Sequence, residues 1–167
     1  MSQCKHLYGY PRDFEKEYEQ LEELGKGSFG VVHRVVSRAT GEFFAVKTLP
    51  KSRPTWGKGQ GGGMKETTTS SYLLKIQAEV NFLARLNDVE EVVQLVKVYE
   101  DDSYVHLVMD LCMGGSLYNK MEAEEELMAE KDEEICSFYF TESRVRSIMS
   151  CVINMLVSCH ARGIIYR

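Results

Sequence analysis

The stretch Gly25-Lys26-Gly27-Ser28-Phe29-Gly30-Val31-Val32 decides the fold, because a β-branched run follows directly on three spaced glycines. Glycines let backbone N–H groups approach phosphate oxygens with no Cβ in the way, so the spacing G-x-G-x-x-G-x-V predicts a phosphate-binding loop. Dinucleotide-binding folds share this glycine spacing but need a helix after the loop and an acidic residue about 20 residues later. Val31 and Val32 predict a strand instead, and residues 47–53 contain no acid. Both observations argue against a dinucleotide site.

A lysine on a later apolar strand strengthens the phosphate-binding prediction. Lys47 ends the run Phe44-Ala45-Val46-Lys47 and lies 17 residues past Gly30 (47 − 30 = 17). Side chains alternate along a strand, so Val46 and Thr48 face away from Lys47. An ammonium group beside a glycine loop predicts a clamp for the α- and β-phosphates of a nucleotide. A solvent-facing lysine is the alternative, and the combined pattern favours the clamp.

Composition limits the class of protein. The 167 residues are 44% apolar and carry a formal net charge of −5, which predicts a packed core and argues against a nucleic-acid partner. The most apolar stretch, Ile148–Cys159, is too short to span a bilayer. Five cysteines without a C-x-x-C pair predict a reduced, cytoplasmic protein with no metal site.

Alternating and β-branched runs predict five strands between residues 18 and 111. The first three follow one another by short connections, which favours an antiparallel meander. The last two are separated by the turn Glu100-Asp101-Asp102-Ser103. The predicted strands are Tyr18–Leu24, Val31–Val36, Phe43–Leu49, Val92–Val98 and Tyr104–Leu111.

Two runs have the spacing of amphipathic helices. The first follows Ser70 or Ser71, either of which can cap a helix, and Glu79 lies beside its stripe. The second begins near Thr141, and Gly163 fits its C-terminal stop. The first stripe is Leu73, Ile76, Val80, Leu83 and Asn87, and the second is Val145, Ile148, Met149, Val152, Leu156 and Cys159.

Three segments lack such patterns. Residues 1–17 predict an irregular lead-in. Residues 51–71 are rich in glycine, serine and threonine and predict a flexible insertion, either a solvated loop or a site of modification. Residues 121–135 contain eight acidic residues against one lysine, which is typical of a solvated face or a mobile segment.

These landmarks occur in the order found in a eukaryotic-type protein kinase domain, and residues 18–167 resemble the N-terminal part of that domain apart from the two insertions. Local runs such as Leu24–Gly30, Thr40-Gly41-Glu42 and His106–Cys112 are most similar to serine/threonine kinases, above all the calcium/calmodulin-dependent and calcium-dependent protein kinase group. No EF-hand loop of the D-x-[DN]-x-[DN]-G type occurs in the sequence.

The resemblance implies an α+β fold in two parts. Residues 18–111 would form the kinase N-lobe, a five-stranded antiparallel sheet with one helix, interrupted by the insertion at 51–71. Residues 112–167 would contain the hinge, the acidic insertion at 121–135 and only the first helices of the helical C-lobe.

The resemblance also implies roles for single residues. Glu79 would pair with Lys47 and hold it toward the phosphates, the alternative being a surface glutamate. Leu24 and Val32 would form the roof of an adenine pocket, Ala45 would lie against the ring and Met109 would be the gatekeeper; these could also be plain core residues. The further expected nucleotide contacts are Gly25, Lys26, Gly27, Ser28, Phe29, Gly30, the backbone of Asp110 and Cys112, and Ser116 in place of a ribose-binding glutamate.

The implied reaction is transfer of the γ-phosphoryl group of ATP, with Mg²⁺, to a serine or threonine of a protein substrate, under regulation linked to calcium or calmodulin. The family's catalytic loop reads H-R-D-L-x-x-x-N, often with Tyr in the first place, and Tyr166-Arg167 matches its first two positions in that form. The catalytic Asp and the metal ligands of that pattern are absent from the 167 residues. We therefore expect a truncated part of an active kinase, inactive alone; the alternative is a non-catalytic nucleotide-binding or docking module.

Overall fold

The computed structural model describes residues 6–56, 64–67, 70–130 and 140–165. The chain divides into two compact units, residues 1–111 and residues 112–167. Each unit is described by itself. The first unit contains the sheet and the glycine loop, and it therefore contains most of the candidate site.

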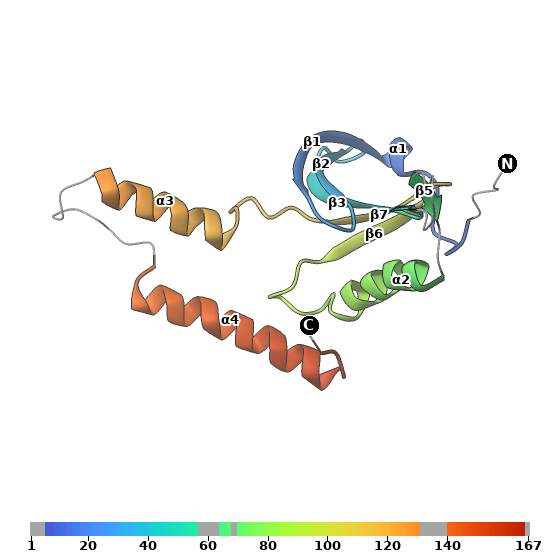
Figure 1. The fold of residues 1–167 in the computed structure, drawn as a ribbon. Coiled ribbons are helices and arrows are strands. Elements are labelled where there is room, and N and C mark those ends of the chain that lie inside the picture. The colour runs from blue at the N-terminus through green and yellow to red at the C-terminus, as the bar shows by residue number, and fades with distance from the viewer. Residues whose placement is uncertain (1–5, 57–63, 68–69, 131–139, 166–167) are drawn as a thin grey trace. The chain divides into compact units, whose positions relative to one another are not determined.

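An antiparallel sheet forms the centre of the first unit (Figure 1). Within the described residues it has five strands in the order β1-β2-β3-β7-β6, and every neighbouring pair is antiparallel. The predicted α+β fold, with one helix on this sheet, is confirmed. The strands are β1 (Tyr18–Lys26), β2 (Val31–Ser37), β3 (Phe43–Pro50), β6 (Leu95–Glu100) and β7 (Tyr104–Asp110).

The sheet is buried on both faces, as β7, an inner strand between β3 and β6, shows. All five residues from Val105 to Met109 are buried, so this strand has no solvent side. One face contributes Leu49, Val105, Leu107 and Met109 to a core that includes the helix α2. The other contributes Val35, Val46 and Val108 to a second core with Phe14, Tyr18 and Tyr99. A sheet with two buried faces needs a cover on each side.

Helix α2 (Ser70–Arg85) covers the first face (Figure 1). Its buried residues are Tyr72, Ile76, Val80 and Leu83. The predicted stripe was wrong at both ends: Tyr72 is buried where Leu73 was expected, and Asn87 lies exposed beyond the end of the helix. Ser70 and Ser71, which were expected to cap the helix, are instead its first two residues, and residues 68–69 lie outside the described residues.

The predicted strand over residues 92–98 begins three residues late, at Leu95. Two amide side chains explain the delay. Gln94 donates through Nε2 to the carbonyls of Val89 and Val92, at 2.8 and 2.6 Å. Asn87 accepts the N–H of Leu95 at 2.5 Å. These bonds hold the chain in turns before the strand begins, and local periodicity does not reveal them.

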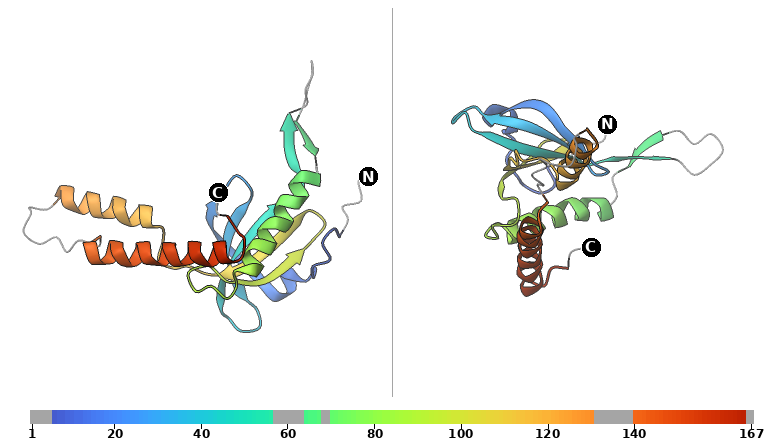
Figure 2. Two further views of the ribbon diagram at one scale, coloured as in Figure 1. Left: turned by 90° about the horizontal axis from the view of Figure 1, so that it is seen from below. Right: turned by 90° about the vertical axis from the view of Figure 1, so that its left-hand side faces the viewer.

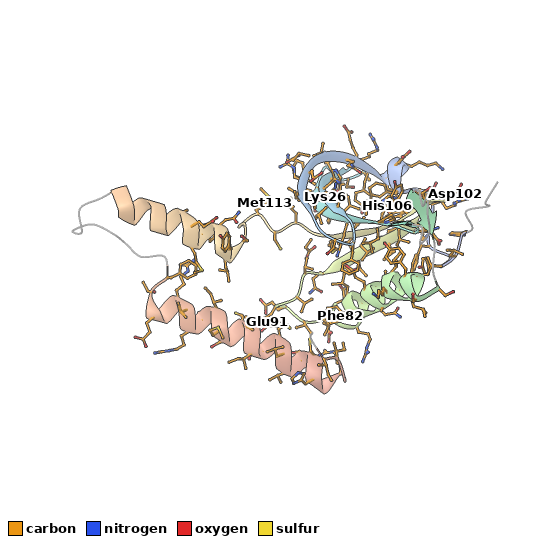
Figure 3. The ribbon with its side chains drawn as sticks, viewed as in Figure 1. Lys26, Phe82, Glu91, Asp102, His106 and Met113 are labelled. Carbon is orange, nitrogen blue, oxygen red and sulfur yellow. The ribbon has the colours of Figure 1, made fainter. Side chains whose placement is uncertain are left out.

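Residues 1–17 are not an irregular lead-in throughout, because residues 14–17 form the short helix α1 (Phe14–Glu17). Phe14 is buried and its ring stacks on His106 at a centroid distance of 4.6 Å. Asp102, labelled in Figure 3, forms an ion pair with Arg12. The segment before β1 therefore supplies part of the cover of the second face. The sequence pattern missed this because every one of these contacts is long-range.

The first insertion departs from the prediction of a flexible segment, whereas residues 121–123 of the acidic segment are exposed, in agreement with the predicted solvated face. Within residues 51–71, β4 (Arg53–Trp56) pairs antiparallel with β5 (Met64–Thr67) as a separate two-stranded sheet, drawn in Figure 2. Residues 121–130 of the acidic segment belong to the helix α3 (Leu117–Glu130). Residues 57–63 and 131–139 lie outside the described residues.

The last helix, α4 (Glu142–Ala161), begins where the sequence predicted. Thr141 is its N-cap and accepts the N–H of Arg144 at 3.3 Å. Gly163 has φ +67°, a conformation that glycine adopts without strain, and it lies just past the helix end. Of the predicted stripe only Cys159 is buried. Among the described residues no helix combines the length and apolar character that crossing a bilayer requires.

Leu107→Ala should lower the free energy of unfolding by about 2–5 kcal/mol, because it leaves a cavity in the core between β7 and α2. The matched control is Leu74→Ala on α2. Leu74 is 68% exposed, so its change should stay within about 0.5 kcal/mol. Chemical denaturation followed by circular dichroism measures both. Equal losses in the free energy of unfolding for the two variants would contradict the burial of Leu107 in this core.

Candidate functional site

The sheet register places the predicted nucleotide residues on one face. Lys47 lies opposite Val32 on β2 and Leu107 on β7. Ala45, two residues before Lys47, lies opposite Met109. Residues directly opposite each other on neighbouring strands point to the same side of a sheet. This side is the one that α2 covers.

Lys47 and Glu79 meet between β3 and α2. The Nζ atom of Lys47 donates to Oε1 of Glu79 at 2.5 Å, although 32 positions separate the two residues. Their side chains are 27% and 29% exposed, so the pair is sheltered yet open to a ligand. An ammonium group carries three donors, and the bond to Glu79 uses one of them. The bond to Glu79 therefore fixes the direction of the Lys47 side chain. The other N–H donors of the ammonium group are able to contact phosphate oxygens.

The glycine loop joins β1 to β2, and Lys26, labelled in Figure 3, lies where β1 ends. Within the loop the N–H of Gly27 donates to the carbonyl of Gly30 at 2.9 Å. A Cβ atom on Gly30 would lie 2.2 Å from the carbonyl oxygen of Thr48, so the fold excludes any side chain there. A Cβ on Gly25 would meet no atom within 4 Å. Gly30 is thus required by packing against β3, whereas Gly25 keeps the loop surface bare.

The predicted pocket residues differ in their burial. Ala45 and Met109 are buried in the sheet, and Val32 is half-buried. Leu24 and Phe29 are large apolar side chains that stay exposed at the loop. Exposed apolar groups beside a bare glycine loop are available to an apolar ring. Lys26 and Ser28 are also exposed at the loop.

A cavity of about 260 Å³ lies between the loop tip and α2. Glu79 and the predicted loop residue Phe29 line it. The sequence analysis missed the remaining lining residues, Leu49, Tyr72, Lys75 and Ile76. Tyr72, Lys75 and Ile76 precede Glu79 at helical spacing on α2, and periodicity alone predicts such positions only as core or surface. The cavity extends the candidate site behind the ion pair.

The predicted hinge contacts fall on both sides of the unit boundary. In the first unit the N–H of Asp110 donates to the carbonyl of Gln94 at 3.1 Å, so this N–H is already used within the fold. Cys112 belongs to the second unit and is exposed. Met113, labelled in Figure 3, follows it and is also exposed.

Ser116 has a local structural role in the second unit. Its hydroxyl donates to Oδ1 of Asn119 at 2.8 Å and accepts the N–H of Asn119 at 3.1 Å. This is the geometry of an N-cap for α3. The expected contact between Ser116 and a ribose stays a prediction that competes with the cap.

Metal-ligating groups are not gathered at the site. In the part of the chain that the structure describes, no three His, Cys, Asp or Glu side chains are placed to hold a metal ion together. Mg²⁺ accompanies ATP in the family that the sequence resembles. No residue within the described ranges is therefore assigned to such an ion.

Comparison with known proteins decides the family. The model of the protein kinase domain matches residues 18–167. The chain belongs to the protein kinase domain family. The resemblance found in the glycine loop and the lysine strand is thereby confirmed, and so is the similarity to calcium-dependent protein kinases.

Two curated relatives of this kinase domain come from plants. Calcium-dependent protein kinase 14 of Arabidopsis thaliana is 29% identical over 155 residues, which is 93% of this chain and 24% of the relative. Calcium-dependent protein kinase 2 of Oryza sativa subsp. japonica is 30% identical over 155 residues, 93% of this chain and 25% of the relative. The chain spans about a quarter of the length of these relatives.

Gly30→Ala should destabilise the kinase domain by about 1–3 kcal/mol, because the added Cβ collides with the carbonyl of Thr48. Gly25→Ala is the matched control in the same loop. It meets open space and should leave stability almost unchanged. Thermal unfolding of both variants measures the difference. A Gly25→Ala loss as large as that of Gly30→Ala would refute the packing role of Gly30.

Proposed function

We propose that residues 18–111 form the ATP-binding part of a protein serine/threonine kinase. The ion pair between Lys47 and Glu79, held at 2.5 Å beside the glycine loop, carries the proposal. A strand lysine fixed by a helix glutamate is the arrangement that holds the α- and β-phosphates in kinases. The relatives named calcium-dependent protein kinases support the same function.

Each part of the site has a defined task in this proposal. The loop from Gly25 to Gly30 covers the phosphates with backbone N–H groups, because no side chain at Gly25 blocks their approach. Lys47 contacts the α- and β-phosphates, and Glu79 keeps its ammonium group in place. Ala45 and Met109 provide an apolar wall for the adenine ring.

The whole protein would then transfer the γ-phosphoryl group of ATP to a serine or threonine of a protein substrate. The names of the relatives support calcium-linked regulation of that whole protein. The cysteine pattern supports a cytoplasmic location. Phosphoryl transfer also needs a base near the substrate hydroxyl, and residues 1–167 contain no match to the Asp of the catalytic loop. A polypeptide of these residues alone should bind ATP and transfer nothing.

Lys47→Met should weaken ATP binding about 10- to 100-fold, because a charged hydrogen-bond donor contributes about 1.5–3 kcal/mol. Lys16→Met is the control, since Lys16 is an exposed lysine paired with Asp13 outside the site. Isothermal titration calorimetry with ATP measures both variants. Equal affinity of Lys47→Met and the wild type would contradict the proposed site.

The polypeptide of residues 1–167 should show no phosphotransfer to a generic protein substrate such as casein. The measurement is the transfer of label from radiolabelled ATP to the protein substrate, and a complete serine/threonine kinase serves as the positive control. Incorporation that disappears in Lys47→Met would overturn this prediction, because a catalytic base within residues 1–167 would then be required.

A further inference from the structure

Two tyrosines from the N-terminal segment bind to α2. The hydroxyl of Tyr8 donates to the carbonyl of Leu73 at 2.8 Å. The side-chain amide of Gln77 donates to the hydroxyl of Tyr10 at 3.0 Å. The two rings stack on each other, with centroids 5.9 Å apart, and pack against the core between α2 and the sheet. The segment thus contacts the helix through both hydroxyl groups and both rings.

These contacts lie on a different side of α2 from the ion pair. An α-helix turns by about 100° per residue, so Gln77 points about 200° away from Glu79. On one side of α2, Lys47 of the sheet binds Glu79, and on the other side Tyr10 binds Gln77. Because the helix is bound on both sides, rotation about its axis would break one of these two contacts.

The N-terminal segment is itself anchored to a buried carboxylate. Glu100, at the end of β6, has no exposed side-chain surface. It accepts the N–H groups of Leu7, Tyr8 and Gly9 at 2.5, 3.0 and 3.0 Å. Gly9 has φ +80°, and this left-handed conformation lets the three N–H groups converge on one carboxylate.

A buried lysine completes the anchor. Nζ of Lys51 lies 2.6 Å from Oε1 of Glu100 and donates to the carbonyl of Asp101 at 2.5 Å. Burial alone would raise the pKa of Glu100, but the Lys51 ammonium and the backbone N–H groups together hold that pKa below its ordinary value. The carboxylate therefore stays charged, and charged hydrogen bonds of this kind are the strong ones. Residues 7–9 are fixed to the sheet at this point.

After Tyr10 the same segment crosses to the other face. The N–H of Glu100 donates to the carbonyl of Pro11 at 2.9 Å, so the chain pairs with the edge strand as it passes. Further on, Glu17 accepts the hydroxyl of Tyr99 at 2.7 Å. This bond fastens the segment to the second core, which does not include α2. The segment therefore makes two tyrosine hydroxyl contacts with α2, and it makes a third, through Glu17, with Tyr99 away from α2.

We propose that Tyr8 and Tyr10 are positioning residues for the Lys47–Glu79 pair, acting through α2 from a segment anchored on Glu100. The proposal rests on the ATP site described above. It predicts that nucleotide affinity depends on two hydroxyl groups that do not line the cavity at Glu79. The functional part of the kinase domain would then begin before residue 18, where the family match begins.

The test compares Tyr8→Phe/Tyr10→Phe with Tyr99→Phe in the chain of residues 1–167. The double variant removes both hydroxyl contacts to α2 and keeps both rings in the core. The control removes one hydroxyl contact of the same segment on the other face. ATP affinity is measured by calorimetry, and hydrogen exchange is measured for the amides of residues 76–80.

We expect the double variant to bind ATP about 3- to 10-fold more weakly, because one or two hydrogen bonds that position the helix are lost. Exchange at residues 76–80 should become faster. Tyr99→Phe should lower the melting temperature and leave ATP affinity and exchange in α2 unchanged. Unchanged affinity in the double variant, or an equal loss in Tyr99→Phe, would overturn the proposal.

A second comparison separates positioning from plain stability. In a Glu79→Gln background the two tyrosine changes should have almost no further effect on ATP affinity, because the ion pair they position is already gone. Full additivity would show that the tyrosines do not act through Glu79. If the wild type binds no ATP, the proposed function fails, and exchange at residues 76–80 decides the positioning role: unchanged exchange in the double variant would refute it.

Discussion

Val46 and Val108 face each other across β3 and β7 and have no exposed surface. The remainder of the first unit depends on this contact. Because side chains alternate along a strand, two valines directed into one core place Lys47 and Leu107 on the opposite face. A slip of one residue would turn Lys47 into the valine core, where an unpaired ammonium is strongly unfavourable. The register that buries the valines is therefore the register that places Lys47 on the face covered by α2, where it meets Glu79.

Burial of both faces requires two covers, and they come from distant parts of the chain. Helix α2 covers the face of Lys47 and brings Glu79 to it. The segment before β1 covers part of the other face through Phe14. Glu100 joins the two covers, because its carboxylate holds the residues that lie against α2 and its N–H holds Pro11 on the way to the second face. The site thus rests on a segment that precedes the matched kinase domain.

Local patterns were sufficient where structure depends on neighbours in the chain. Strands β2, β3 and β7 and the cap of α4 were predicted within a residue or two, because periodicity and capping chemistry act over a few positions. Local patterns were insufficient where hydrogen bonds to distant residues decide the structure. The start of β6 is delayed by the amide of Asn87, eight residues before its partner. The conformation of residues 7–9 depends on the carboxylate of Glu100, which lies more than 90 residues away.

The glycine spacing, the strand lysine and the order of the landmarks were enough to identify a kinase domain and to predict a phosphate-binding loop, because these features are short, contiguous and chemically specific. Only the tertiary structure showed why Gly30 must be glycine, since the obstacle is the backbone of Thr48 on another strand. It likewise decided that Glu79 meets Lys47, that Ser116 caps a helix and that Tyr8 and Tyr10 hold α2. Except for the Ser116 cap, these are pairings across an intervening stretch of chain, and a linear pattern carries no record of which distant groups the folded core brings within hydrogen-bond distance.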